Sequence, residues 1–334
     1  MKNTDLDFYL CAACGGRLQL QEGFAPDGTG NVMEGTIGCS SCGAKRSIIR
    51  GIPRFVEPEN YASSFGYQWN IHRKTQLDSH TGMPISRHRL FSGSGWPERL
   101  DGQRLLEAGS GAGRFTEVLL QTGADVFSFD YSSAVEANFS NHHDQPNLHL
   151  FQGDIFNIPL PKKTFDKVVC LGVLQHTPDP EMAFKSLAGF VKPGGELFID
   201  VYRASLPAYL QWKYVLRPLT KLMTKETLYK VVSLTTPPLI GPSAISRKLF
   251  GRAGARIFPI VEYSHLGLPA RLNKEWAVLD TFDMYSPAHD YPQTLAAVRG
   301  WFESDGFTDV DVKRGQNGII GKGKMPAGAA SRTF

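Results

Sequence analysis

The stretch that most constrains the fold is residues 104–115, Arg-Leu-Leu-Glu-Ala-Gly-Ser-Gly-Ala-Gly-Arg-Phe. A short apolar run ends in Glu107, and Gly109, Gly111 and Gly113 follow on alternate positions before an amphipathic helical pattern begins. A strand, a tight turn and a helix start in this order are typical of the nucleotide-binding loop of a doubly wound α/β fold. Glycine suits the turn because the backbone bends sharply and a ligand can approach where no Cβ stands in the way.

The glycine spacing discriminates between nucleotide ligands. A dinucleotide fingerprint needs its third glycine where Arg114 stands, and the Gly-Lys-Ser/Thr ending of a P-loop is absent. Glu107 would repel a pyrophosphate, whereas it suits the cationic, amine-bearing end of S-adenosylmethionine. On this motif, residues 106–113, the chain resembles the class I S-adenosylmethionine-dependent methyltransferases of the type 11-like group. The resemblance implies a Rossmann-like, seven-stranded doubly wound α/β sheet and S-adenosylmethionine as cofactor.

The length and the net charge of the chain limit the functions that it can have. The chain has 334 residues and a formal net charge of +4. This length suits two domains, or one domain with additions. So slight a charge gives no sign of an extended basic surface for nucleic acid, so a nucleic-acid partner is disfavoured. The N-terminus lacks the apolar core of a signal peptide and no apolar run is long enough to span a bilayer, so we expect a cytoplasmic protein.

Two Cys-x-x-Cys pairs, Cys11/Cys14 and Cys39/Cys42, flank a Gly-rich, strand-like stretch. Two such pairs point to a structural zinc site with four thiolates, although the gap between them is longer than in most ribbons. A redox pair or free thiols are the alternative. Residues 1–57 resemble the zinc-ribbon domain of the Trm112 family, which implies a role in folding and docking. We call residues 1–57 the ribbon.

Acids at later strand ends extend the cofactor site. Asp130 lies 17 positions beyond Gly113 and suits a ribose diol, with a helix N-cap as the alternative role. By the resemblance, Asp154 accepts from the adenine amino group and Ile155 covers the ring. An aromatic segment before the loop would pack over the cofactor's methionine end, or its aromatics could simply pack on the sheet. The residues expected to bind the cofactor are Glu107, Gly109, Gly111, Gly113, Asp130, Tyr131, Asp154, Ile155, Leu171, Tyr67 and Trp69.

The alternation of strand and helix patterns predicts the domain organisation. Residues 58–103 form a linker and pre-loop helices, and residues 104–202 with 290–323 form the methyltransferase domain, which ends in a hairpin. Residues 203–289 form a helical lid, which we call the insertion, and residues 324–334 a disordered tail. A helix at 179–191 precedes the fifth strand.

The insertion is basic, aromatic and broken by prolines, with helix-like pieces at 206–223 and 226–234. Its stripe Tyr209, Trp212 and Leu216 favours packing, with docking on a lipid surface as the alternative. We expect it to shape the acceptor pocket. The candidate pocket residues near its end are Asp283, Tyr285, His289 and Asp290.

Methyl transfer to oxygen or nitrogen needs a base, and a histidine near neutral pKa is the natural choice. If the resemblance holds, His176 faces the methyl site at the end of the fourth strand, with His289 as the second candidate. A histidine at such a turn could instead cap backbone groups.

Three functions stay open. We favour methyl transfer to an oxygen, nitrogen or carbon of a small-molecule acceptor, such as a sugar, a lipid-linked intermediate or a secondary metabolite. The second is an rRNA or tRNA methyltransferase, because one ribosomal-RNA guanine family also joins a Cys-rich zinc module to this fold. The third is a non-catalytic binding module, which the intact glycine loop and strand-end acids disfavour. The sequence does not tell the acceptor or the oligomeric state.

Overall fold

The computed structural model describes residues 1–28, 30–57, 60–205 and 211–328. Part of the predicted linker (58–59), the start of the predicted 206–223 helix with Tyr209, and most of the predicted tail (329–334) lie outside the described residues.

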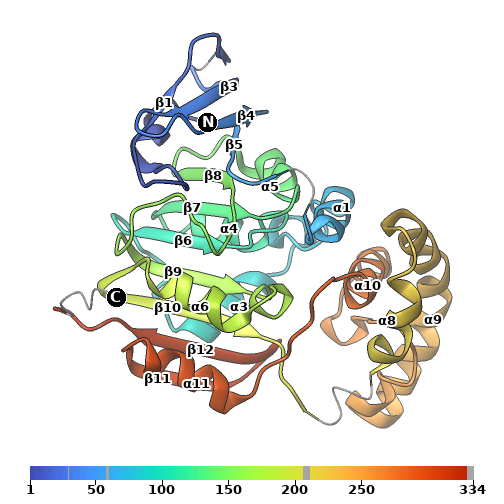
Figure 1. The fold of residues 1–334 in the computed structure, drawn as a ribbon. Helices are drawn as coiled ribbons and strands as arrows, with labels where there is room; N and C mark the ends of the chain where they lie inside the picture. The colour runs from blue at the N-terminus through green and yellow to red at the C-terminus, as the bar shows by residue number, and fades with distance from the viewer. Residues whose placement is uncertain (29, 58–59, 206–210, 329–334) are drawn as a thin grey trace.

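The central sheet has the predicted Rossmann-like, doubly wound order (Figure 1). Its strands, from the ribbon side outward, are β8 (Leu148–Gln152), β7 (Asp125–Asp130), β6 (Arg104–Ala108), β9 (Phe165–Leu171), β10 (Val191–Val201), β12 (Gly318–Lys324) and β11 (Thr308–Gly315). The first five are parallel, and β12 runs antiparallel to both β10 and β11. The strand order reverses between β6 and β9, which is where open α/β sheets bind ligands.

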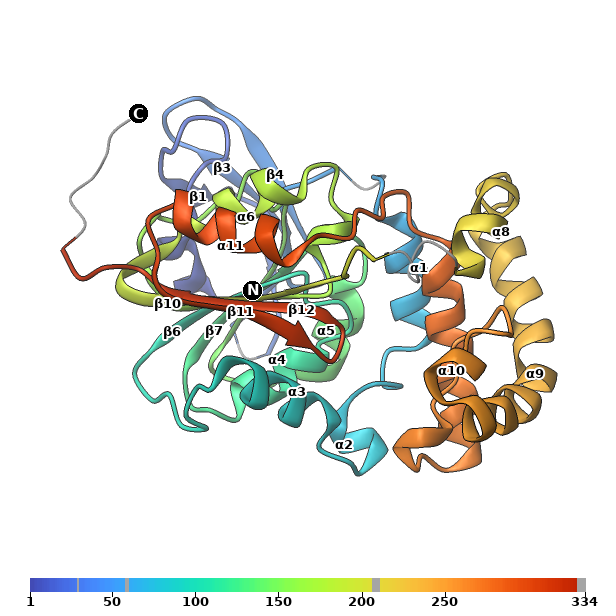
Figure 2. The same ribbon diagram turned by 90° about the horizontal axis from the view of Figure 1, so that it is seen from below.

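Helices cover both faces of this sheet, as Figure 2 shows. On one face lie α3 (Ile85–Ser94), α4 (Arg114–Leu120) and α5 (Val135–His142). On the other face lie α6 (Pro180–Ala188) and α11 (Leu295–Ser304). Two apolar cores result, because parallel strands covered on both faces need apolar side chains in both directions.

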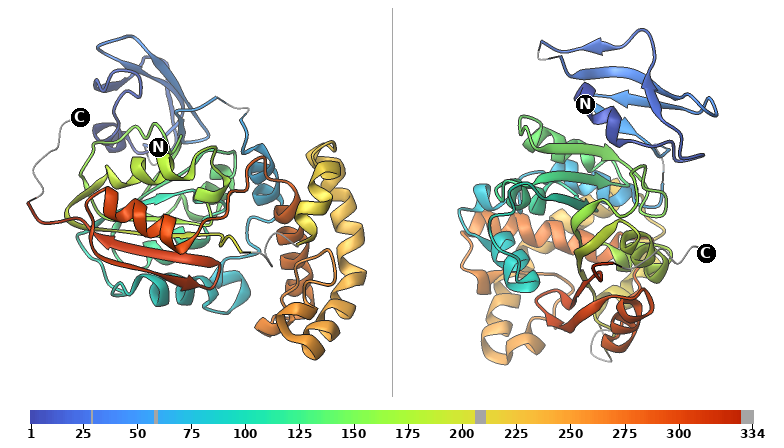
Figure 3. Two further views of the ribbon diagram at one scale, coloured as in Figure 1. Left: turned by 60° about the horizontal axis from the view of Figure 1, so that its bottom comes forward. Right: turned by 90° about the vertical axis from the view of Figure 1, so that its left-hand side faces the viewer.

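The ribbon extends the sheet beyond β8 (Figure 3, right). Its elements are η1 (Asn3–Phe8), β1 (Leu18–Leu20), β2 (Ala25–Pro26), β3 (Val32–Cys39), β4 (Lys45–Ile49) and β5 (Ile52–Arg54). β5 pairs with β8 in parallel through Arg54 and Gln152.

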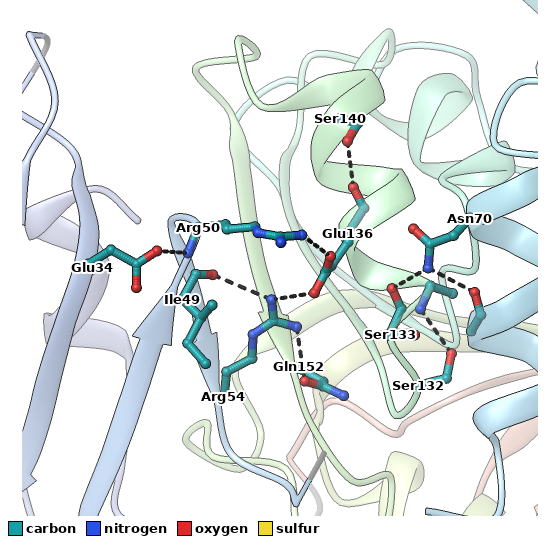
Figure 4. A network of polar contacts seen from close by, with 12 residues as sticks. Glu34, Ile49, Arg50, Arg54, Asn70, Ser132, Ser133, Glu136, Ser140 and Gln152 are labelled. Atoms are coloured by element: carbon teal, nitrogen blue, oxygen red, sulfur yellow. Dashed lines mark hydrogen bonds and ion pairs between the residues drawn. The ribbon is translucent and has the colours of Figure 1, made fainter. Parts of the chain in front are cut away.

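Polar side chains reinforce that junction (Figure 4). The Arg54 guanidinium donates to Gln152 Oε1 at 3.0 Å and to Glu136 Oε1 at 3.0 Å. Arg50 donates to the other oxygen of Glu136 at 2.8 Å. Arg54 is buried and Arg50 is exposed, so Arg54 is the inner member of the network.

The insertion forms a separate helical layer beside the sheet (Figure 3, left). Its elements are α8 (Trp212–Thr220), α9 (Lys225–Gly254), η3 (Ser264–Leu266) and α10 (Ala270–Tyr285). α10 contacts α1 (Ser63–Ile71), which with α2 (Asp78–Thr81) precedes α3. Among the described residues, no helix is both long and apolar enough to cross a membrane.

Two expectations about these helices were wrong. The helix expected at 226–234 continues to Gly254, and its prolines do not break it. Pro238 and Pro242 lie on the exposed side, where water can replace the hydrogen bonds that proline removes. The break comes at Gly251, whose φ of 60° and ψ of −140° are not helical.

Candidate active site

A cavity of about 640 Å³ lies at the carboxyl ends of β6, β7 and β9, within the range of small-ligand sites. The sheet and the helices before it supply one part of the wall and the insertion supplies another. The predicted site residues that line it are Trp69, Gly109, Gly111, Asp130, Tyr131, Ile155, Leu171, His176 and Asp283.

The glycine loop forms the floor of the cavity. Gly109 and Gly111 have φ of 76° and 54°, a region that side chains other than glycine rarely adopt. A Cβ on Gly109 would lie 2.3 Å from Val173 Cγ2, so its packing admits no side chain. A Cβ on Gly111 would meet the Trp69 indole at 3.2 Å, so Trp69 covers the loop at this point.

Asp130 borders the cavity at the end of β7. Its Oδ2 accepts from the Gly111 amide at 2.9 Å, and its Oδ1 accepts from the amide and hydroxyl of Ser132 at 2.8 and 2.6 Å. A carboxylate has about four acceptor positions, so one is left for a ligand. Burial raises the pKa of Asp130, against the opposing hydrogen bonds. The alternative N-cap role does not apply, because α5 begins after Ala134.

Glu107 is hidden beneath the loop. Its Oε2 accepts from the hydroxyls of Thr116 and Ser128 at 2.5 and 2.6 Å, and the residue is 3% exposed. Burial raises the pKa of this carboxyl to about 7, although both hydroxyls oppose the shift. Glu107 therefore links β6 to α4 and β7, off the described cavity wall.

Four other residues that were predicted to bind the cofactor or to act in catalysis also lie off the described cavity wall: Gly113, Asp154, Tyr67 and His289. Asp154 accepts from the Phe156 amide at 2.9 Å in the turn after β8, beside the cavity-lining Ile155. Tyr67 packs edge-on against Tyr229 of the insertion.

Tyr61 is a wall residue that the sequence reasoning missed, because it sits in a stretch that reads as linker. Its ring centroid is 4.8 Å from that of Tyr131. The sequence signal that could have indicated a cavity residue was an aromatic side chain within a segment that contains proline and asparagine.

His176 is held in one orientation. Its Nδ1 lies 2.9 Å from the carbonyl oxygen of His289, which only accepts, so Nδ1 carries the proton and Nε2 the lone pair. The rings of Phe65 and Tyr202 flank it at centroid distances of 5.1 and 5.3 Å. Burial lowers the pKa of His176, with Asp283 and the His289 carbonyl opposing, so the imidazole is neutral near pH 7.

The insertion attaches to this end of the cavity through charged groups. Lys213 Nζ and Arg217 Nη1, both from α8, lie 2.8 Å from Asp290 Oδ2. Burial raises the pKa of Asp290, but these two cations lower it more, and the net shift is downward. Asp290 thus lies behind the wall as the partner of two wall cations, while the expected pocket residue Tyr285 bonds the Pro259 carbonyl.

Asp283 belongs to the wall and links α10 to α1. Its Oδ1 accepts from Gln68 Nε2 at 3.0 Å, and its Oδ2 lies 3.5 Å from the Tyr202 hydroxyl. The carboxylate therefore stands in the same part of the cavity as His176, whose titration it influences.

The four paired cysteines converge in the ribbon, away from the described cavity wall. The Sγ atoms of Cys11 and Cys42 are 3.7 Å apart, those of Cys14 and Cys39 are 3.5 Å apart, and all four lie within 4.8 Å of one another. Tetrahedral zinc with Zn–S bonds of about 2.3 Å separates its sulfurs by about 3.8 Å. The donor set and spacing fit one zinc ion.

Residues 106–199 match the family model described as a methyltransferase domain. A ubiquinone biosynthesis O-methyltransferase of Coxiella burnetii is 34% identical over 113 residues, which are 33% of this chain and 48% of that protein. The enzyme of the same name from Methylococcus capsulatus is 28% identical over 180 residues, 50% of this chain and 72% of that protein. The chain thus spans about half the length of the Coxiella relative.

Similar solved structures are more distant. The Haloferax volcanii complex of the Trm112 methyltransferase activator with a methyltransferase has 13% identity and a TM-score of 0.46, covering 81% of this chain and 99% of that one. An S-adenosylmethionine-dependent methyltransferase from Aquifex aeolicus has 14% identity and a TM-score of 0.41, covering 81% and 99%.

The strand order, the glycine loop at its reversal point and the family match define the class. Residues 106–199 match a methyltransferase domain, as the sequence predicted, and the strand order around them is the Rossmann-like order expected for a class I methyltransferase.

Proposed function

We propose that the chain is an S-adenosylmethionine-dependent methyltransferase that methylates an oxygen of a small-molecule acceptor in the 640 Å³ cavity. The observation that carries the proposal is His176: a buried imidazole whose Nδ1 lies 2.9 Å from the His289 carbonyl oxygen, in the wall that also contains the glycine loop and Asp130. The O-methyltransferase relatives support oxygen as the acceptor atom.

The cofactor end of the cavity fits S-adenosylmethionine. Asp130 retains an acceptor position for a ribose hydroxyl, and Ile155 and Tyr131 offer apolar surface for the adenine. The crowded glycine loop under Trp69 brings backbone close to the ligand, where a side chain would exclude it. The bound cofactor supplies a methyl group already activated on a sulfonium.

His176 serves as the general base. Nε2 takes the proton of an acceptor hydroxyl as the oxygen gains its methyl group, and Nδ1–H keeps its bond to the His289 carbonyl throughout. The nearby Asp283 carboxylate stabilises the imidazolium that results. Lys213 and Arg217 on the same wall align the acceptor, and alignment supplies much of the rate.

The ribbon binds a structural zinc ion through Cys11, Cys14, Cys39 and Cys42. Four thiolates leave no open position for water, so the metal serves folding and not chemistry. A role in folding and not in chemistry agrees with the finding that none of the four cysteines lines the described cavity wall.

The experiment is a labelled-methyl transfer assay with purified protein, comparing small-molecule extracts with total RNA as acceptors. We expect label in a small molecule, as a methyl group on oxygen. Label confined to RNA, or no transfer by a protein that binds the cofactor, would contradict the proposal. Unaltered turnover in His176→Gln would show that His176 is not the general base.

A further inference from the structure

α8 is an amphipathic helix packed with its charged side inward. Lys213 and Arg217 are buried against Asp290, while Trp212, Val215 and Leu219 face out and Leu216 packs inward. The outward apolar residues, with their exposed fractions, are Trp212 39%, Val215 63% and Leu219 61% on α8, and Leu222 84% in the turn that follows it. Their spacing of three or four places them on one helical face. A helix that only covered a core would show the reverse arrangement.

α9 continues this pattern. Its exposed apolar residues are Val231 40%, Leu234 77%, Ile245 63%, Leu249 69% and Phe250 65%. Figure 2 shows α8 and α9 on the side of α10 that faces away from the sheet. Trp212 Nε1 donates to the Ile257 carbonyl at 3.0 Å, which ties the start of α8 to the segment after α9. Exposed apolar side chains in this number on both helices are typical of an interaction site.

The charge of the same segment identifies the partner. Residues 212–257 contain one acid, Glu226, and nine basic residues: Lys213, Arg217, Lys221, Lys225, Lys230, Arg247, Lys248, Arg252 and Arg256. Three of the nine are paired with acids outside this segment, Lys213 and Arg217 with Asp290 and Arg247 with Glu262. The whole chain has 36 basic and 32 acidic residues, so the remainder has 27 basic and 31 acidic and is net negative. Lys221, Lys230, Lys248 and Arg256 are exposed.

A second copy of the chain fits this surface poorly. A two-fold interface brings the same patch of both copies together and would oppose two basic surfaces. An anionic lipid bilayer instead satisfies both properties: the acyl boundary takes the apolar stripe and the headgroups take the basic residues. Trp212 has the amphipathic side chain that such interfaces favour.

We propose that α8 and α9 form a docking surface for an anionic lipid bilayer. Gln211, Tyr214 and Arg256 of this segment also line the cavity, so docking places the cavity beside the membrane surface. This surface is independent of the chemistry proposed for His176.

The test is co-sedimentation of the full chain with vesicles of phosphatidylcholine, with and without phosphatidylglycerol. We expect binding only to vesicles containing phosphatidylglycerol, weakening as salt rises. Lys230→Glu/Lys248→Glu should weaken it about tenfold or more, since each basic residue near the surface contributes substantially. Leu219→Glu/Leu222→Glu should weaken it similarly.

Met182→Glu is the matched control, because Met182 is 58% exposed on α6, outside this surface, and its variant should bind vesicles as the parent does. Melting temperature and cofactor binding of all variants should match the parent, which separates lost docking from misfolding. Equal binding to both vesicle types, no binding, or double variants that bind like the parent would overturn the proposal. A parent dimer that Leu219→Glu/Leu222→Glu dissociates, without vesicle binding, would assign the surface to a second copy.

Discussion

The ribbon and the insertion are two additions to the same sheet, attached in different ways. The ribbon joins through backbone, since β5 pairs with β8 and Arg54 reinforces the junction. The insertion joins through charged side chains around the cavity, with Asp290 and Asp283 as the anchors. No described ribbon residue lines the cavity, whereas α8 and α10 contribute to its wall. We therefore propose that the ribbon serves stability and that the insertion helps to bind the acceptor.

Loss of the proposed zinc site should have the largest effect on stability. We expect Cys11→Ser to lose the metal and to lower the melting temperature strongly, because zinc binding contributes on the order of 10 kcal/mol to the folding of small ribbons. Metal analysis and thermal melts with and without chelator measure this. Cys170→Ala, in β9, is the control that should keep its zinc. A structural role of zinc would be contradicted if the folded parent contained no zinc, or if Cys11→Ser had the melting temperature of the parent.

His176→Gln should lower kcat by about 10²- to 10⁴-fold while leaving cofactor affinity unchanged. Since burial lowers its pKa below 6.5, the parent should keep its activity at neutral pH and lose it as falling pH protonates the imidazole. The variant should lack this acid limb. His289→Gln should stay near the parent rate, because the structure uses the carbonyl of His289. If His289→Gln lowers kcat more than His176→Gln does, His289 and not His176 is the base.

Asp290→Asn should destabilise the attachment of the insertion by about 3–5 kcal/mol, because two buried cations lose their counter-charge. The folded pKa of Asp290 is below its usual value, so the stabilisation is fully present near neutral pH and is lost as pH falls through the folded pKa. Urea unfolding at pH 7 and in acid measures both.

Asp311→Asn is the control for that variant, since it breaks the exposed Lys313 pair and should cost about 1 kcal/mol or less. Equal losses in the two variants would mean that the Asp290 cluster does not anchor the insertion.

Arg54→Met should give the smallest effect, a loss of about 1–3 kcal/mol from the ribbon junction with cofactor binding intact. Arg50→Met is the matched comparison, because Arg50 contacts the same Glu136 but its side chain is 71% exposed. It should change the free energy of unfolding by less than about 1 kcal/mol. Weakened cofactor binding in Arg54→Met would contradict the separation of the ribbon from the site.

Features encoded by neighbouring residues could be predicted from the sequence. The glycine loop, Asp130 and the four cysteines each lie in a short stretch from which a role could be predicted, and the fold confirms the sheet that the loop implied. His176 could be placed at the cavity because strand ends share one edge of a parallel sheet.

Features that depend on distant partners could not be predicted. Asp290 draws Lys213 and Arg217 inward, so α8 turns its apolar side outward, and this pairing spans more than 70 residues. Of the expected stripe, Leu216 does pack against a core, while Trp212 is exposed. Tyr67 and Trp69 are two positions apart on α1, about 200° around the helix, so only one of them can face the cavity.

The most direct measurement is titration calorimetry of the parent, Asp130→Ala and Asp130→Asn with S-adenosylmethionine. We predict binding by the parent and a loss of roughly 10- to 100-fold in both variants, since each removes a charged acceptor of the ribose. Asp144→Ala, an exposed carboxylate outside the described wall, should bind like the parent. No binding by a folded parent, or equal affinity in the parent and the two folded Asp130 variants, would contradict the assignment of this cavity to the cofactor.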